Sequence, residues 1–347
     1  MRFKEFALNF KYAFRPHKPG LIVRLIKTVI RSQVFKNPPL RYVDFAVDFD
    51  CNMKCKHCFA TVLRNDNRRR MTPDDYSRVA EECVKLGTVN FSFQGGEPLL
   101  LKNLPDIITA CKPEKNVISV TTNGTLLTYD NISKMKKIGV DIFTISLDSS
   151  IPEEHDNFRG MKGAFDKTLQ GMKIAIKKGI NITLGAVVTH QNLKSEGING
   201  LIRMAKQYHI ILNIILPVSA GRWLNNREVS LTSEDLKYIE ELTLSSPYIR
   251  TDFQANLGKY GCGAGKEILY ITPYGDVLVC PFIHISFGNI FEDPISVIRS
   301  RVLQNPYFSV YHQKCLASTD VEFIEKYLNK TLKADKLPLD YKNVFGQ

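Results

Sequence analysis

The feature that most constrains the fold is a regular alternation of strand-like and helix-like runs along residues 41–249. The first run, YVDFAVDFD at residues 42–50, alternates apolar residues such as Val43 and Phe45 with acidic ones, the period of two expected of a strand. Helical patterns separate it from later strand-like runs, so the sequence predicts parallel strands with helices outside. The later strand-like runs are residues 89–94, 117–123, 141–148, 181–188 and 211–218. Six units favour an α/β fold of the partial (β/α)6, TIM-like barrel type over a closed eightfold barrel.

The alternation stops near residue 250. The stretch GCGAGKEILYITPYGDVLVCPF predicts a β-hairpin with its turn at residues 273–276, and a helix is expected from Pro294. We therefore predict four parts. These are a basic amphipathic helical segment (1–40), the partial barrel (41–249), a smaller module (250–325) and a C-terminal tail (326–347).

A cysteine-rich loop follows the first predicted strand. The stretch FDCNMKCKHCFA places Cys51, Cys55 and Cys58 with three and then two residues between them. Thiolates at such spacing bind zinc or an iron–sulfur cluster, and His57 lies between two of them, where its side chain is expected to point elsewhere. Three protein ligands leave one coordination position open, which is typical of a catalytic centre.

Polar motifs also follow the next strands, where the chemistry of such folds collects. Directly after the second strand stand Gly95, Gly96, Glu97 and Pro98. Glycine lets the backbone approach a ligand closely, and the Glu97 carboxylate could accept a hydrogen bond from an ammonium group. Small polar residues suited to ribose hydroxyls end the third strand, and further polar residues follow the fourth. These residues are Thr122, Asn123, Ser146 and Arg159.

Taken together, residues 43–220 resemble the radical S-adenosylmethionine (radical SAM) superfamily. The Cys51-x3-Cys55-x2-Cys58 loop and the Gly-Gly-Glu-Pro sequence are similar to two of its motifs. The resemblance implies a [4Fe–4S] cluster whose open iron binds S-adenosylmethionine. The reduced cluster cleaves that cofactor to a 5′-deoxyadenosyl radical, which abstracts a substrate hydrogen atom. The resemblance also implies contacts with the cofactor. His57 and Phe59 would contact the adenine, and the methionyl amino group would be bound by Gly95, Gly96, Glu97 and Pro98. The ribose or carboxylate would be bound by Thr122, Asn123, Ser146 and Arg159.

A second set of cysteines lies in the C-terminal part. Cys262 and Cys280 flank the predicted hairpin, which brings them together, and Cys315 follows with no cysteine after it. This arrangement is similar to the SPASM/twitch extension of radical SAM enzymes, in the shorter form with one auxiliary iron–sulfur cluster. Zinc, or three unrelated thiols, is the alternative. A fourth ligand could come from Asp320, His312, water or the substrate. Cys83 and Cys111 lie in apolar helical patterns and are expected to be core thiols.

The net charge of +12 is concentrated at the N-terminus, since residues 1–42 carry ten Lys and Arg against one Glu, nine of the twelve charges. The near-balance elsewhere argues against nucleic-acid binding by the whole protein. Within residues 18–36, Arg24, Lys27 and Arg31 share one helical face. The opposite face is apolar and comprises Leu21, Ile22, Leu25, Ile26, Val29 and Ile30. Such a helix can lie on an anionic membrane or pack on the barrel with its charges solvated.

These features predict a cytoplasmic enzyme, peripheral to the membrane if the basic helix binds lipid. No apolar run is long enough to span a bilayer. Oxidation or epimerisation of a small molecule or glycoside is favoured, because residues 1–42 are too short for the N-terminal peptide-recognition domain of peptide-modifying members. The alternatives are a peptide-modifying enzyme (RiPP maturase), a radical enzyme acting on nucleic acid, and a non-catalytic zinc or iron–sulfur scaffold. An electron donor such as flavodoxin or ferredoxin is expected. Substrate-pocket residues are expected near Asn213, Ser219 and Trp223.

Overall fold

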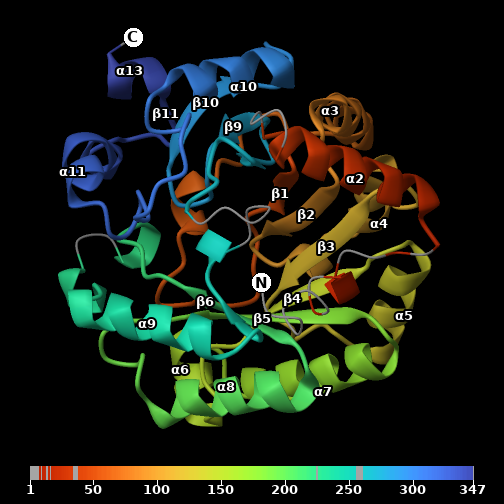
Figure 1. Cartoon of the computed structure of the whole chain (residues 1–347), viewed down its shortest axis with the longest axis vertical. Helices are drawn as coiled ribbons and strands as arrows, with labels where there is room; N and C mark the ends of the chain where they lie inside the picture. Colours follow the sequence, from red (N-terminus) through yellow and green to blue (C-terminus); the bar gives the residue numbers. More distant parts are fainter. Residues whose placement is uncertain are drawn as a thin grey trace.

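The centre of the molecule is a curved sheet of parallel strands with helices outside it (Figure 1). The computed structural model describes every residue except 1–7, 9, 13–14, 16, 34–37, 224–225, 255–260 and 347. The parallel strands are β1 (Tyr42–Asp48), β2 (Asn90–Gly95), β3 (Val117–Thr122), β4 (Ile142–Ser146), β5 (Asn181–Val187), β6 (Ile211–Ile215) and the short β7 (Ile249–Arg250). The free edge of β1 pairs with a strand of the C-terminal module rather than with β6, so the barrel is not closed. The predicted α/β partial barrel is confirmed.

Helices connect successive strands and cover the convex face of the sheet. They are α3 (Pro73–Leu86), α4 (Leu104–Ala110), α5 (Tyr129–Lys137), α6 (Pro152–Arg159), α7 (Ala164–Lys177), α8 (Glu196–Tyr208) and α9 (Ser233–Ser245). Helix α3 begins at a capping box in which Thr72 and Asp75 satisfy each other's backbone amides, with Pro73 in the first turn. It ends at Gly87, whose φ of 109° favours glycine. Local sequence signals therefore set both ends of this helix.

The two faces of the sheet differ in polarity. The helix-facing side forms the main core, where the Phe45 ring stacks 5.9 Å from both Phe91 and Phe93. The concave side carries polar residues, including Asp44 and Ser92. Burial of the aromatic face accounts for most of the stabilisation, while the polar lumen leaves room for cavities at the site described below.

Beyond β1 the sheet continues into the C-terminal module. Strand β8 (Ile268–Ile271) pairs parallel with β1, β9 (Asp276–Leu278) antiparallel with β8, β10 (Ile285–Asn289) antiparallel with β9, and β11 (Leu339–Asp340) parallel with β10. The predicted hairpin is thus β8–β9. Its turn contains Gly275 at φ 82°, where a Cβ would lie 2.8 Å from Ile290. The module is an extension of the barrel sheet, not a separate sheet.

The remaining elements of the module pack on this extension (Figure 1). The predicted helix after Pro294 is α10 (Ile295–Gln304). Residues further on form α11 (Val321–Phe323), a π-helical turn (Ile324–Leu328), α12 (Asn329–Leu332) and α13 (Tyr341–Phe345). The last residues, predicted as a tail, pack on the module, since the Phe345 ring lies 6.0 Å from Phe287. The four-part division of the chain stays a prediction.

The N-terminal segment covers the end of the barrel where the strands begin. In α2 (Pro19–Gln33), Leu21 packs with residues at the starts of the strands, including Val89 and Val117. Just before the helix, Lys18 Nζ lies 2.6 Å from a carboxylate oxygen of Asp141. The described part of this segment therefore belongs to the barrel.

The predicted faces of α2 need correction. Arg24 was expected on the solvated face, but its guanidinium donates to the Lys115 carbonyl at 3.0 Å and to Asn116 Oδ1 at 2.8 Å. A different side of the helix faces solvent and exposes large apolar side chains, namely Val23, Ile26, Val29 and Ile30. Helical periodicity identified the apolar residues of this helix, but it did not predict which side of the helix packs against the barrel. The Arg31 side chain lies outside the described residues. Among the described helices, none is both long and apolar enough to cross a membrane.

Candidate functional site

The first cysteine set lies on one loop at the carboxyl end of β1. Cys55 is buried, Cys58 is half-buried and Cys51 is exposed. The loop is fixed by backbone hydrogen bonds, from Cys58 N to the Cys55 carbonyl (3.4 Å) and from Lys56 N to the Phe158 carbonyl (3.0 Å). The three thiols thus share one anchored segment at the end of the barrel where the predicted motifs converge.

Backbone amides point at sulfur in both cysteine sets. In the first set, Met53 N lies 3.4 Å from Cys51 Sγ. In the second set, amides two or three residues further along donate to sulfur, from Ala264 to Cys262, from Phe282 to Cys280, and from Ala317 and Ser318 to Cys315. Such bonds favour the thiolate, the form that binds iron. The donor set therefore fits iron–sulfur clusters, whereas Cys83 and Cys111 are fully buried core thiols, as predicted.

A buried ion pair stands beside the first set. Arg159 Nε lies 2.6 Å from Asp148 Oδ2, and its Nη1 lies 3.8 Å from Cys55 Sγ. Burial alone would raise the pKa of Asp148, but the Arg159 guanidinium overrides it and leaves that pKa below its usual value. Asp148 is fixed in turn by the Val187 amide at 3.0 Å. Arg159 therefore places a held positive charge next to the thiols, while its predicted contact with cofactor stays a prediction.

Glu97 forms the centre of a hydrogen-bond network at the ends of β2 and β3. Its carboxylate is 1% exposed and accepts from Thr122 Oγ1 at 2.8 Å, from Asn123 N at 2.8 Å and from Leu99 N at 3.1 Å. A carboxylate has about four acceptor positions, so roughly one is left. The expected bond from an ammonium group would use that position. Pro98 is buried and begins the 3-10 turn that follows.

The two glycines before Glu97 serve backbone packing. A Cβ on Gly95 would lie 2.0 Å from the Asp48 carbonyl oxygen, and one on Gly96 would lie 2.0 Å from that of Asp50. Gly96 N and Glu97 N donate to these same two carbonyls, both at 2.8 Å. The glycines let the end of β2 touch the start of the cysteine loop, a reason different from the expected approach to a ligand.

Other predicted cofactor residues also lie at the strand ends. Asn123 Nδ2 donates to Asn52 Oδ1 at 2.8 Å and lies 4.0 Å from Cys51 Sγ, which ties the end of β3 to the cysteine loop. Ser146 is the last residue of β4, half-buried and paired with Gly185 of β5. Both side chains belong to the same end of the barrel as the thiols.

Aromatic rings surround the cysteine loop. His57 stacks on Phe158 with ring centroids 4.5 Å apart and lies 5.6 Å from Trp223, so its ring packs on these two aromatic residues. Burial lowers the pKa of His57 to about 3, and its Nδ1 is buried without a partner in the part of the chain that is described. Phe59 packs edge-on against Phe282 of the C-terminal module at 4.9 Å. Their predicted contact with adenine stays a prediction.

The second cysteine set lines one cavity. Cys262, Cys280 and Cys315 border a space of about 340 Å³ on the concave side of the sheet, next to Asp252 and the predicted pocket residue Asn213. Asp252 is hydrogen-bonded to Asn213 at 2.9 Å. It acts electrostatically on all three thiols and contributes to raising each thiol's pKa, although burial is the larger cause. Sequence reasoning missed this carboxylate.

Of the two side chains predicted as fourth ligands, Asp320 has a partner elsewhere, whereas His312 Nε2 is buried without one among the described residues. Asp320 caps α11 by accepting from Phe323 N at 3.0 Å. The His312 ring stacks on Tyr307 at 5.9 Å, while its carbonyl accepts from Cys262 N at 2.7 Å. Neither lines the thiol cavity. Across the described ranges, no group of three or more His, Cys, Asp or Glu side chains converges as a single metal ion would need.

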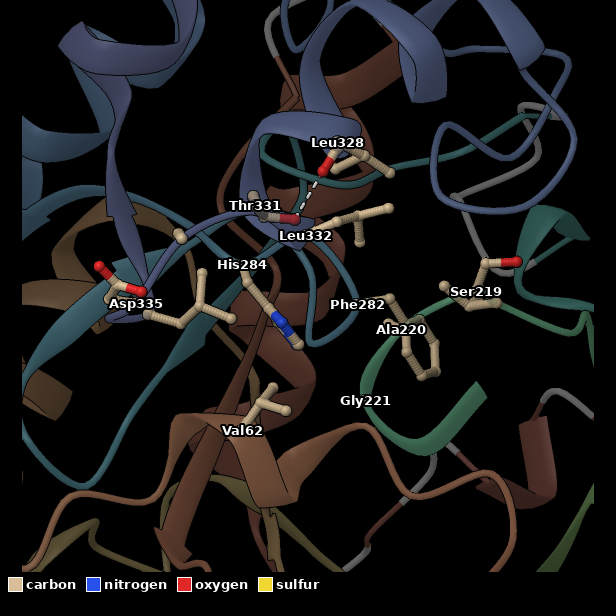
Figure 2. A pocket seen from close by; sticks show the side chains of 13 residues that line it. Val62, Ser219, Ala220, Gly221, Phe282, His284, Leu328, Thr331, Leu332 and Asp335 are labelled. Carbon is tan, nitrogen blue, oxygen red and sulfur yellow. Dashed lines mark hydrogen bonds between the residues drawn. The ribbon is translucent and has the colours of Figure 1, made fainter. Parts of the chain in front are cut away.

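A second cavity adjoins the first. It measures about 310 Å³ and shares Val218 and Phe282 with the thiol cavity. Figure 2 shows it bordered by Ser219, a predicted pocket residue, by the C-terminal residues around Leu328, and by His284. Trp223, the third predicted pocket residue, packs on His57 and Phe158 instead.

A partial barrel with three thiols on one loop at the end of β1, and three more around a cavity of its extended sheet, is the framework of a protein with two iron–sulfur sites. Residues 49–199 match the family model described as radical SAM superfamily, and residues 262–318 match the SPASM model, described as an iron-sulfur cluster-binding domain. The chain belongs to the radical SAM superfamily and carries a C-terminal SPASM domain. Its cofactors are S-adenosylmethionine and a [4Fe–4S] cluster, with an auxiliary iron–sulfur cluster in the SPASM domain.

Several relatives share most of this architecture. The chain is 26% identical over 286 residues to an AdoMet-dependent heme synthase of Methanosarcina barkeri (strain Fusaro / DSM 804), covering 74% of this chain and 81% of the relative. It is 26% identical over 309 residues to the antilisterial bacteriocin subtilosin biosynthesis protein AlbA of Bacillus subtilis (strain 168), covering 83% and 67%. The crystal structure of Streptococcus suis SuiB bound to precursor peptide SuiA matches with a TM-score of 0.62 at 18% identity, over 90% of this chain and 77% of that one. The last likeness concerns the fold alone.

Proposed function

We propose that this radical SAM enzyme abstracts a hydrogen atom from a small organic substrate and oxidises or epimerises it. The observation that carries the proposal is the pair of adjoining cavities, of about 340 and 310 Å³. The first is lined by the auxiliary thiols, and the second by residues that include Gly221, which packs against the Cys58 carbonyl. Cavities of this size suit compact ligands.

In this proposal the chain's residues position the reaction and the cofactors supply the radical chemistry. Cys51, Cys55 and Cys58 would hold the [4Fe–4S] cluster, which when bound would supply the electron that S-adenosylmethionine needs for cleavage. Glu97 offers its unused acceptor position to the cofactor's ammonium group. Arg159 offsets the negative charge of the thiolates from its held place at Cys55.

A peptide substrate is the second candidate, and the relatives favour it. SuiB is described as bound to a precursor peptide, and AlbA as a bacteriocin biosynthesis protein. One peptide side chain would occupy the cavities while the backbone stayed outside. The heme synthase relative adds a third substrate to test, an iron porphyrin.

The decisive experiment measures 5′-deoxyadenosine from the reconstituted holoenzyme with S-adenosylmethionine and dithionite. Three arms would add a deuterated small-metabolite extract, a deuterated peptide extract or iron coproporphyrin. We expect deuterium in 5′-deoxyadenosine from the small-metabolite arm. Deuterium from the peptide arm alone, or stimulation by the porphyrin alone, would transfer the proposal to that substrate. No 5′-deoxyadenosine in any arm would favour the scaffold alternative.

We also propose flavodoxin or ferredoxin as the electron donor, because the first cluster must be reduced for each cleavage. Replacing dithionite by NADPH, a flavodoxin reductase and flavodoxin should sustain 5′-deoxyadenosine formation. Ferredoxin with its own reductase is the matched arm. Failure of both, with dithionite active, would contradict the assignment.

A membrane role for α2 is proposed on the exposed apolar stripe that includes Val23, Ile26 and Ile30, with the exposed Lys27 beside it. Apolar side chains flanked by lysine suit an anionic lipid surface. We expect co-sedimentation with vesicles containing phosphatidylglycerol but not with phosphatidylcholine vesicles, and reduced binding for Ile26→Glu. The control is Leu244→Glu, at an exposed apolar residue of α9. Absence of vesicle binding by the wild type would contradict a membrane role for α2.

A further inference from the structure

The cavity bordered by the C-terminal residues contains one buried polar atom that nothing satisfies. His284 is 4% exposed, and its imidazole points into this space (Figure 2). Its Nε2 is buried without a hydrogen-bond partner among the described residues. The ring does bond to the Pro281 carbonyl, and this bond must belong to Nδ1. Buried polar atoms without partners are rare in proteins, so this one needs an explanation.

The tautomer of His284 follows from that bond. A ring nitrogen that faces a carbonyl carries the proton and donates, so Nε2 keeps its lone pair and is an acceptor. Burial lowers the pKa of His284 to about 4, which keeps the ring neutral near pH 7. The cavity therefore presents an acceptor, not a cation.

The rest of the cavity wall has few polar groups that are free to bind a ligand. Around the imidazole, Figure 2 shows apolar side chains, such as Val62 and Phe282. The hydroxyl of Thr331 is already committed, since it donates to the Leu328 carbonyl at 2.7 Å. Asp335, the carboxylate of the lining, is an exposed residue. The Ser219 hydroxyl points away from the imidazole (Figure 2). A ligand beside the imidazole would therefore meet mainly apolar walls and one inward-facing acceptor.

His284 also lies close to the segments that carry both cysteine sets. Its ring centroid is 6.5 Å from that of Phe59, the residue directly after Cys58. Along the chain it follows Cys280 by four residues. A ligand bonded to Nε2 would thus lie where the proposed function requires the substrate.

We propose that His284 Nε2 is a specificity-determining acceptor that binds a hydroxyl or amine hydrogen of a compact, largely apolar substrate. The inference rests on the proposed function and deepens it by naming the chemistry that the substrate must present. It predicts that the protein binds two molecules of equal shape with different affinity when only one of them carries a hydrogen-bond donor. Hydroxyl and amine donors are distinguished by comparing the two as probes.

The test uses fluorine NMR on the oxidised holoenzyme, without S-adenosylmethionine or reductant. The probes are 3-fluorophenol, 3-fluoroaniline and the donor-free fluorobenzene. For the wild type we expect one or both donor probes to bind about tenfold more tightly than fluorobenzene, the effect of one buried hydrogen bond. His284→Phe should remove this preference, whereas His284→Gln, whose side-chain carbonyl can accept, should keep part of it.

Thr331→Val is the matched control, because it alters the same cavity but removes a hydroxyl that already has a partner. It should keep the preference for donor probes. Iron content and far-UV circular dichroism check that each variant is folded. Equal binding of all three probes to the wild type, no binding of any probe, or a preserved preference in His284→Phe would overturn the inference. Because no turnover is measured, each of these results is independent of the 5′-deoxyadenosine assay.

Discussion

The two cysteine sets are built in different ways. Cys51, Cys55 and Cys58 share one loop beside the Arg159 guanidinium. The second set comes from three separated segments around a cavity that also contains the Asp252 carboxylate. The first set is local in sequence and next to a positive charge, whereas the second depends on tertiary structure and lies near a negative charge. The difference predicts that the sets will respond differently to substitution and will differ in redox potential.

The largest expected effect separates the two sets by function. Under the proposed assignment, Cys55→Ala removes a ligand of the [4Fe–4S] cluster, so 5′-deoxyadenosine formation should fall below detection. Cys280→Ala should lose the auxiliary cluster but keep cleavage without substrate. The measurements are 5′-deoxyadenosine by chromatography and iron per chain. Unchanged iron in Cys280→Ala would show that the second set holds no cluster.

The next effect concerns the buried ion pair beside the first set. Arg159→Met leaves the Asp148 carboxylate buried and unpaired, which should lower the free energy of unfolding by about 3–5 kcal/mol. Arg203→Met, at an exposed pair with Glu196 whose side chains are 64% and 65% exposed, should cost less than about 1 kcal/mol. Urea unfolding of the apoprotein compares the two variants. Equal losses would mean that the buried pair has no special role in the fold.

How far the sequence predicts this molecule depends on how local each feature is. Strands such as β1 follow from alternation within one segment, and Cys51 to Cys58 from spacing within one loop, so both were predicted. The orientation of α2 was not, because Arg24 faces inward to reach the Lys115 carbonyl, an acceptor distant in sequence. Asp252 was missed for the same reason, since only the packing of the segment after β7 on the barrel brings it to the second set.

A smaller effect of the same ion pair is expected in the pH dependence of stability. The pKa of Asp148 is lowered in the fold, so its stabilising contribution is complete above the ordinary aspartate pKa of about 4 and is lost as pH falls through its lower folded pKa. In Arg159→Met, burial dominates and raises the pKa of Asp148. That variant should therefore lose stability as pH rises through the raised pKa, above about 4. Urea midpoints between about pH 3 and pH 6 test this, and parallel curves for wild type and variant would contradict it.

The smallest expected effect tests the difference in charge between the sets. Asp252→Asn removes a carboxylate near Cys262, Cys280 and Cys315 while keeping its hydrogen-bonding shape with Asn213. A negative neighbour disfavours the extra electron of a reduced cluster, so the variant should raise the potential of the auxiliary cluster by an amount on the order of tens of millivolts. Redox titration followed by electron paramagnetic resonance resolves both clusters. The potential of the first cluster is the internal control, because its thiols are next to Arg159 instead. A shift of equal size in both clusters would mean that the carboxylate acts on the whole lumen and not on the second set.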